Sequence, residues 1–231
     1  MKLPVLKIGN LVAEVPIVQG GMAIRLSTAR LAAAVASEGG IGLIAASGMK
    51  FDELRKEIRL ARELTGGKGI IGINAMVAAR EFLGLITTAA EEKVDLIVAG
   101  AGFSRDMFAV GRKYDVAIVP IVSSVKLAKI AEQLGASAIV AEGTEAGGHL
   151  GTQQSIKEIL PEIVKAVKIP VIAAGGAVTG QDVAELLKLG ASGVQMGSRF
   201  AASEESNGAD ELKQFYLKMT EDDVVQIDSP V

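Results

Sequence analysis

The stretch LGASAIVAEG at residues 134–143 marks the passage from a helix into a strand, and LGASGVQMGS at residues 189–198 repeats it. In both, a leucine ends an amphipathic segment, a glycine stops the helix, and a short apolar run follows. Short apolar runs are typical of strands in a parallel sheet, because helices bury both faces of such a sheet. The repeat therefore predicts alternating helices and strands around a parallel sheet.

The same alternation covers nearly the whole chain. Strands are predicted at residues 16–18, 41–44, 69–73, 96–99, 116–120, 138–141, 171–174 and 193–196. Helices are predicted from residue 27, at 51–64, 79–91, 104–113, 124–134, 156–167 and 181–189, from residue 198, and at 210–219. Eight strand–helix units are the number that closes a barrel, whereas an open doubly wound sheet of this length would use fewer strands. We therefore predict the α/β class with a (β/α)8 TIM-type barrel of parallel strands.

Two regions are expected. Residues 1–203 hold the barrel, and residues 204–231 form a C-terminal helix and tail. The final stretch TEDDVVQIDSPV has no evident capping or closing element. We expect it to be the start of a cap segment that this chain lacks.

Composition narrows the class of protein. Apolar residues make up 49% and aromatic residues only 3%, which suits an aliphatic sheet. The net charge is −3 with both signs interspersed, so neither nucleic acid nor a membrane surface is an expected partner. The absence of cysteine excludes disulfides and cysteine nucleophiles. No signal peptide or membrane-spanning run is recognisable, so we expect a cytoplasmic protein.

Glycines follow several of the predicted strands. In barrels of this type the active site lies at the carboxyl ends of the strands, and the loops after strands seven and eight often bind phosphate. Here these loops are residues 173–177 and 195–199, and both are rich in glycine. A single glycine pair is explained by a tight turn, but two such loops at these positions favour phosphate binding.

Five segments resemble the nitronate monooxygenase family, once called 2-nitropropane dioxygenases, which also contains FMN-dependent enoyl-acyl-carrier-protein reductases. The segments are PIVQGGMA (16–23), GIN (72–74), AEGTEAGGHLG (141–151), IPVIAAGGAVTG (169–180) and LGASGVQMGSRF (189–200). The match runs in consistent order from about residue 16 to residue 231.

This resemblance implies an FMN-binding site. The residues it assigns to the flavin ring are Gly20, Gly21, Met22, Asn74 and Glu142. Those it assigns to the phosphate side are Gly147, Gly148, Gly175, Gly176, Gln195, Met196, Gly197 and Ser198. Alone, each has a structural explanation, such as core packing for Met22 or a turn for Asn74. Their placement at successive strand ends favours the flavin site.

The chain contains one histidine, His149, directly behind the glycine pair of the loop after the sixth strand. Imidazole titrates near neutral pH and can both accept and donate a proton. We expect His149 to be catalytic, as a proton-transfer group or as a group that orients the substrate. No metal site is expected, because neither a second histidine nor a cysteine is available as a ligand.

The resemblance leaves two reactions open. A nitronate monooxygenase oxidises alkyl nitronates with oxygen to a carbonyl compound and nitrite, whereas the reductases reduce enoyl thioesters with NAD(P)H as co-substrate. Leu150 stands where nitronate enzymes often have arginine, and residues 19–23 lean toward the reductases.

Residues 152–155 match the reductases' usual threonine pair only in part. We predict a nitronate monooxygenase-like oxidoreductase, with the enoyl reductase as the alternative and a non-enzymatic flavin-binding barrel as a third reading. A small-molecule substrate is the expected partner, and a homodimer stays open.

Overall fold

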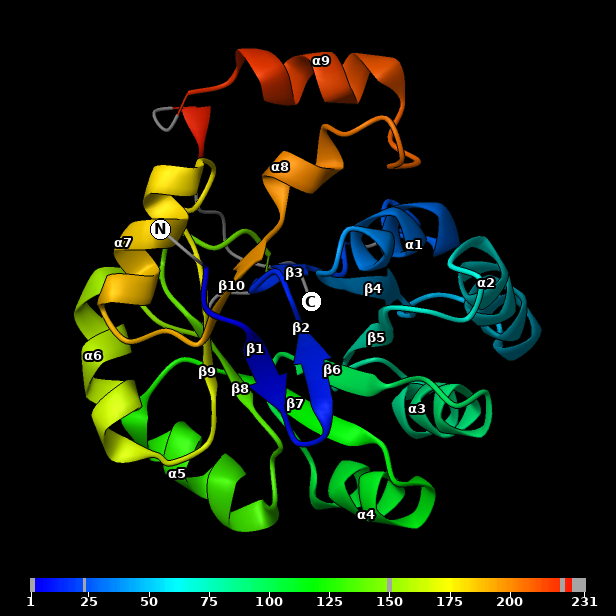
Figure 1. Ribbon diagram of the computed structural model, residues 1–231, viewed down its shortest axis with the longest axis horizontal. Helices are drawn as coiled ribbons and strands as arrows, with labels where there is room; N and C mark the ends of the chain where they lie inside the picture. The colour runs from blue at the N-terminus through cyan, green and yellow to red at the C-terminus, as the bar shows by residue number, and fades with distance from the viewer. Residues whose placement is uncertain (1–2, 23, 149–150, 221–222, 226–231) are drawn as a thin grey trace.

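The protein is a closed barrel of eight parallel strands in the order β10-β3-β4-β5-β6-β7-β8-β9, as the computed structural model shows (Figure 1). The structure describes residues 3–22, 24–148, 151–220 and 223–225. The barrel strands are β3 (Ile17–Gln19), β4 (Ile41–Ala45), β5 (Ile70–Met76), β6 (Leu96–Gly100), β7 (Ala117–Val122), β8 (Ile139–Glu142), β9 (Val171–Ala174) and β10 (Gly193–Met196). The predicted (β/α)8 barrel is confirmed.

A helix follows each barrel strand, and the helices form a ring outside the strands (Figure 1). They are α1 (Ala29–Ser37), α2 (Phe51–Leu64), α3 (Phe82–Glu91), α4 (Arg105–Tyr114), α5 (Val125–Leu134), α6 (Ile156–Ala166), α7 (Gly180–Lys188) and α8 (Ser198–Ala201). Gly135 ends α5 with φ 96°, as the repeated LGAS stretch predicts.

Several boundaries differ from the prediction, most clearly those between β5 and α3. β5 extends to Met76, and α3 begins only at Phe82 rather than at residue 79. Two contacts hold the longer strand: Met76 pairs with Gly100 of β6, and the Met76 amide donates to the Ser47 hydroxyl at 2.9 Å. Neither partner is local in sequence, so periodicity could not show the extension.

The core has two layers. Ile41 and Leu43 of β4 belong to the cluster inside the barrel, whereas Ile44 belongs to the cluster between the barrel and the helices. This alternation follows the two-residue period of a strand. Gly42 faces the Ala32 backbone of α1, where a side chain would collide, so the glycine lets α1 pack closely on the sheet.

A hairpin that the sequence did not predict covers one end of the barrel. β1 (Leu6–Ile8) pairs antiparallel with β2 (Leu11–Ala13) in front of the barrel (Figure 1). Leu6 and Ile8 are buried in the cluster inside the barrel, and a Cβ on Gly193, at the start of β10, would lie 2.9 Å from a Leu6 methyl group. The hairpin therefore closes the end at which the strands begin.

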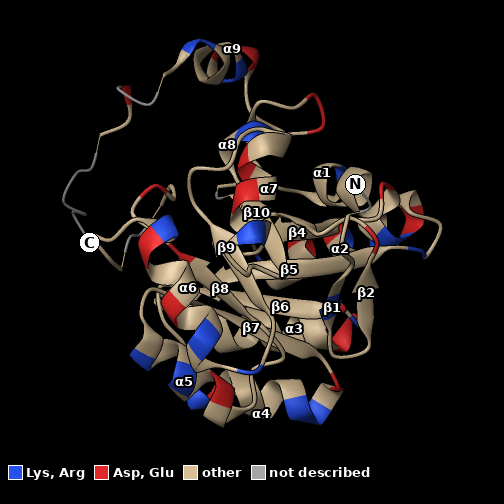
Figure 2. Cartoon of the chain, turned by 60° about the vertical axis from the view of Figure 1, so that its left-hand side comes forward, with Lys and Arg blue, Asp and Glu red and all other residues tan. Residues whose placement is uncertain are grey.

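The C-terminal region divides in two. Residues 204–208 pack on the barrel, since Ser206 is 2% exposed and the Asn207 amide donates to the Leu26 carbonyl at 3.2 Å. α9 (Asp210–Lys218) contains no buried residue and lies beyond α8, away from the barrel (Figures 1 and 2). Charges of both signs are spread over the outer helices (Figure 2). Among the described residues, none of the helices has the length and hydropathy needed to span a membrane.

Candidate active site at the carboxyl ends of the strands

The loops after β3 and β10 lie against each other. The Gly20 amide donates to the Met196 carbonyl at 2.9 Å. A Cβ on Gly20 would lie 3.3 Å from that carbonyl oxygen and 3.4 Å from Cγ of Gln195. Gly20 is thus a neighbour of Gln195 and Met196, although more than 170 positions separate it from them along the chain.

The loop after β3 also reaches β5 and the start of α8. A side chain on Gly21 would collide with the side chain of Asn74. The sulfur of Met22 lies 4.0 Å from where a Cβ of Gly197 would be. Ser198 is exposed and begins α8. The structure therefore gathers four of the five residues assigned to the flavin ring at one edge of the barrel mouth: Gly20, Gly21, Met22 and Asn74.

A second group forms where β8 and β9 end. Glu142 pairs in register with Ala174, and the Gly143 amide donates to the Ala174 carbonyl at 3.0 Å. Gly175 and Gly176 follow with φ 126° and 64°, both in the left-handed region. Because neither carries a side chain, this part of the loop offers only backbone to a ligand.

The glycine pair before the histidine has a different setting. Nothing lies within 4 Å of a Cβ on Gly147 or on Gly148, so neither glycine is required by close packing. Gly148 has φ 105°, which does require glycine. His149, predicted to be catalytic, and Leu150 lie outside the described residues.

Glu142 has the most unusual electrostatic setting of the mouth. Burial raises the pKa of its carboxyl to about 7, because the charged form loses solvation there. A carboxyl with such a pKa can hold or release a proton at neutral pH, as catalytic acids do.

A buried polar network that the sequence analysis missed shapes the loop after β3. The Gln19 side chain is fully buried, and its amide donates to the Ser27 hydroxyl at 3.0 Å and also to the Gly20 carbonyl. Its oxygen accepts from the Leu43 amide at 3.0 Å, and the Met22 amide donates to the Ser27 hydroxyl at 2.9 Å. The available signal was a polar residue inside an apolar strand, directly before the glycines.

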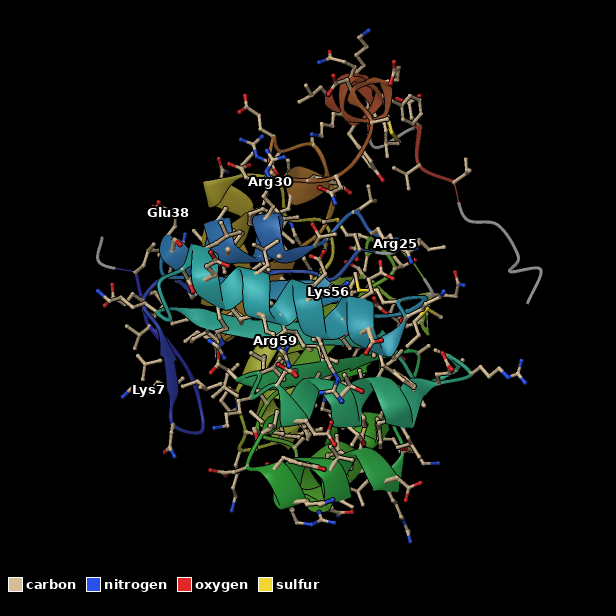
Figure 3. All side chains as sticks on the ribbon, turned by 90° about the vertical axis from the view of Figure 1, so that its right-hand side faces the viewer. Lys7, Arg25, Arg30, Glu38, Lys56 and Arg59 are labelled. Carbon is tan, nitrogen blue, oxygen red and sulfur yellow. The ribbon has the colours of Figure 1, made fainter. Side chains whose placement is uncertain are left out.

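An ion pair anchors the same loop from outside. The Arg25 guanidinium bonds both carboxylate oxygens of Glu53, at 2.6 and 2.9 Å. Glu53 lies in the first turn of α2, and Arg25 lies near the end at which this helix begins (Figure 3). The loop is therefore held both at its buried base and at its exposed tip.

Among the described residues, two buried side-chain oxygens have no hydrogen-bond partner: the Ser104 hydroxyl at the N-cap of α4 and the side-chain oxygen of Gln195 in β10. The side-chain oxygen of Gln195 is buried and accepts no hydrogen bond from any described residue. Buried acceptors are normally paired, so a donor from a bound molecule would satisfy it. A flavin ring carries such an N–H donor, and the side-chain-free loop at Gly175 and Gly176 suits a phosphate. The residues present therefore fit FMN.

The comparison with known proteins agrees with this arrangement. Two overlapping segments, residues 6–84 and 70–231, match the family model described as nitronate monooxygenase. The chain belongs to the nitronate monooxygenase family. The family inferred from the glycine-rich segments is thereby confirmed, and so is its class, the oxidoreductases.

Three similar proteins show how far the likeness extends. A (3aS,4S,5R,7aS)-5-hydroxy-7a-methyl-1-oxo-octahydro-1H-indene-4-carboxyl-CoA dehydrogenase from Rhodococcus jostii (strain RHA1) is 34% identical over 202 residues, which are 87% of this chain and 56% of the relative. A probable nitronate monooxygenase from Staphylococcus aureus (strain Newman) is 31% identical over 257 residues, with 92% of this chain and 72% of the relative covered. The solved structure of FabK from Thermotoga maritima has a TM-score of 0.85 at 38% identity, and the match covers 89% of this chain and 65% of the FabK chain. The chain therefore spans little more than half of the Rhodococcus relative.

Proposed function

We propose that this chain binds FMN at the barrel mouth and oxidises alkyl nitronates with oxygen to a carbonyl compound and nitrite. The observation that carries the proposal is the unpaired, buried oxygen of Gln195, which lies beside Gly20 in a chain of this family. An N–H donor of the flavin ring would satisfy this oxygen, since the neighbouring Gly20 is one of the residues that the resemblance assigns to the ring.

The ring side would be held by Gly20, Gly21, Met22, Asn74 and Glu142. We add Gln195 to this side, although the resemblance assigns it to the phosphate side, because its unpaired oxygen lies beside Gly20. On the phosphate side we propose the loop at Gly147 and Gly148, the loop at Gly175 and Gly176, and the residues around the start of α8, which are Met196, Gly197 and Ser198. These loops suit one terminal phosphate, and no further glycine-rich strand–helix unit is left for the second half of FAD. When bound, FMN supplies the electron chemistry.

The protein's own contribution would be orientation and proton control. A nitronate is an anion, and a carboxylate beside it would repel it, whereas a protonated Glu142 can donate a hydrogen bond to a nitronate oxygen. With a pKa of about 7, Glu142 is protonated in a large share of molecules at neutral pH. We propose that His149 orients the substrate or transfers its proton from the same loop.

A second candidate is the reduction of an enoyl thioester with NAD(P)H. The Rhodococcus relative is named for a carboxyl-CoA substrate, which is a thioester, and it is 34% identical to this chain. Residues 19–23 lean in the same direction. In this reaction His149 would protonate or orient the reduced chain.

Two measurements test these proposals. Heat release of the bound cofactor and chromatography should give FMN, and FAD or no flavin after reconstitution would refute the cofactor assignment. Anaerobic mixing then separates the reactions. Reduction of the flavin by an alkyl nitronate without pyridine nucleotide supports the monooxygenase, and reduction by NAD(P)H supports the reductase. Flavin that is bound but reduced by neither supports a non-enzymatic barrel.

A further inference from the structure

The loop between β8 and α6, residues 143–155, is closed at its base by its own backbone. The Thr144 amide donates to the Gln154 carbonyl at 2.9 Å, so the two ends of the loop lie side by side. Gly143 is close to the Ile156 amide, and a side chain there would collide with it. The loop that carries His149 therefore leaves and re-enters the barrel at nearly the same place.

The carboxylate of Glu145 joins these two ends. One oxygen accepts from the Ser155 hydroxyl at 2.5 Å, and the other accepts from the Ile156 amide at 2.9 Å. Ser155 is the N-cap of α6, so Glu145 binds the first amide of that helix from the other end of the loop. Burial by itself would raise the pKa of Glu145, but these two donors, its own backbone amide and the positive charge of Lys157 together outweigh burial, and the pKa is lowered.

Glu145 also lies on the glycine pair after β9. A Cβ on Gly176 would be 3.6 Å from Cβ of Glu145, and a Cβ on Gly175 would be 3.1 Å from the Ala146 amide. One residue thus touches three parts of the mouth: its own loop, the start of α6, and the side-chain-free loop proposed to bind phosphate. No other carboxylate among the described residues is in this position.

We infer that Glu145 is a positioning residue that fixes the His149 loop against the Gly175–Gly176 loop and the start of α6. It sets the substrate side and the phosphate side of the mouth relative to each other, and its effect on catalysis rests on the function proposed above. Glu145 does not carry the transferred proton, because both of its oxygens are engaged by hydrogen-bond donors.

Glu158 provides a matched control. It too is a carboxylate at the start of α6, and it accepts from the Ser155 amide at 3.1 Å as part of the capping box. Both carboxylates are exposed, but Glu158 lies within the helix, whereas Glu145 reaches the helix from the other end of the loop. The variants Glu145→Ala, Glu145→Gln and Glu158→Ala therefore separate positioning of the loop from capping of the helix.

Hydrogen exchange tests the loop without reference to activity. In the flavin-free protein, Glu145→Ala should raise amide exchange over residues 144–155 about tenfold, and Glu158→Ala should leave residues 144–148 unchanged. Glu145→Gln should behave like the wild type, because its amide can both accept from Ile156 and donate to Ser155. If Glu145→Ala does not fold, Glu145→Asp replaces it, since the shorter side chain cannot reach both partners.

Flavin binding and reduction give the second readout. Glu145→Ala should raise the FMN Kd about tenfold and slow flavin reduction by about 10- to 100-fold, with the pH profile retained and with rescue by Glu145→Gln. The inference would be overturned if Glu158→Ala weakened FMN binding and slowed flavin reduction as much as Glu145→Ala does. It would also be overturned if Glu145→Ala left amide exchange and the FMN Kd unchanged. If the wild type binds FMN but no substrate reduces it, the proposed function fails, while exchange and Kd still decide the role of Glu145.

Discussion

The two carboxylates of the loop after β8 differ in what surrounds them. Glu142 is partly buried, and this burial raises its pKa to about 7. Glu145, three residues later, is held by two hydrogen-bond donors, which keep its pKa low. Since only the first can exchange a proton near neutral pH, Glu142 is the better second candidate for proton transfer beside His149.

Replacing Glu142 with Gln should change how stability depends on pH. The folded protein keeps this proton up to about pH 7, whereas the unfolded chain releases it near 4.5. The free energy of unfolding should therefore fall as pH rises through this window, by about 1–3 kcal/mol. Glu142→Gln removes that loss. The free energy of unfolding of the flavin-free variant should therefore exceed that of the wild type at pH 8 but not at pH 4.5. Urea unfolding at several pH values measures this, and parallel curves for the two proteins would contradict it.

Replacing His149 with Ala should affect chemistry but not binding. The residues proposed to hold FMN lie mainly in other loops, so flavin content and thermal unfolding should stay unchanged. Flavin reduction by substrate should slow by about 10²–10⁴-fold, and one limb of its pH profile should disappear. Rapid mixing across pH measures both. A normal rate with an unchanged profile would make Glu142 the carrier of the proton.

At the scale of the elements, β3 and β4 separate toward the mouth. The paired residues of these two strands end with Gln19 and Gly42. Beyond this pair, the side-chain oxygen of Gln19 accepts a hydrogen bond from the next amide of β4, that of Leu43. A side chain that replaces a ladder bond lets the strands diverge without leaving the amide unpaired. This opens the loop after β3 toward β5 and β10, where the ring-side residues meet.

The loop after β9 gives a prediction at the same scale. Gly176→Ala places a Cβ at φ 64° on the surface proposed for phosphate. The strain should cost about 1–2 kcal/mol, and the FMN Kd should rise about tenfold because the backbone can no longer approach the ligand closely. Gly135→Ala is the control, with φ 96° and open space at the end of α5. It should be strained too but leave the Kd unchanged, as titration followed by flavin fluorescence would show. Equal Kd changes in both would disprove the phosphate assignment.

At the scale of the whole molecule, the barrel is complete before α9. The hairpin closes one end, the loops form the other, and residues 204–208 pack on the outside. α9 adds no buried residue. We therefore propose that the division between barrel and C-terminal region lies near Ala209 rather than after residue 203.

Two shortened chains test this division. A chain that ends at Ala209 should unfold within about 1 kcal/mol of the full chain and bind FMN equally well. A chain that ends at Ser203 loses the buried Ser206 and the bond to Leu26, and should be less stable by about 1–3 kcal/mol. Urea unfolding compares the three proteins. Equal losses in both shortened chains would mean that α9 itself stabilises the barrel.

The sequence by itself determined the order of the barrel strands and helices, the barrel and the family. Apolar runs, amphipathic segments and glycine stops such as Gly135 are local signals, because a strand or helix is set by residues a few positions apart. The residues proposed to hold the flavin were likewise named from short segments, which together resemble the family and follow successive strands.

Only the tertiary structure decided which residues these side chains contact and how deeply they are buried. The hairpin, the bond from Gln19 to Leu43, the bridge of Glu145 across its loop and the raised pKa of Glu142 all depend on neighbours that other parts of the chain supply. Burial and hydrogen bonding are properties of distance in space, and the closed barrel brings together strand ends that are far apart in sequence.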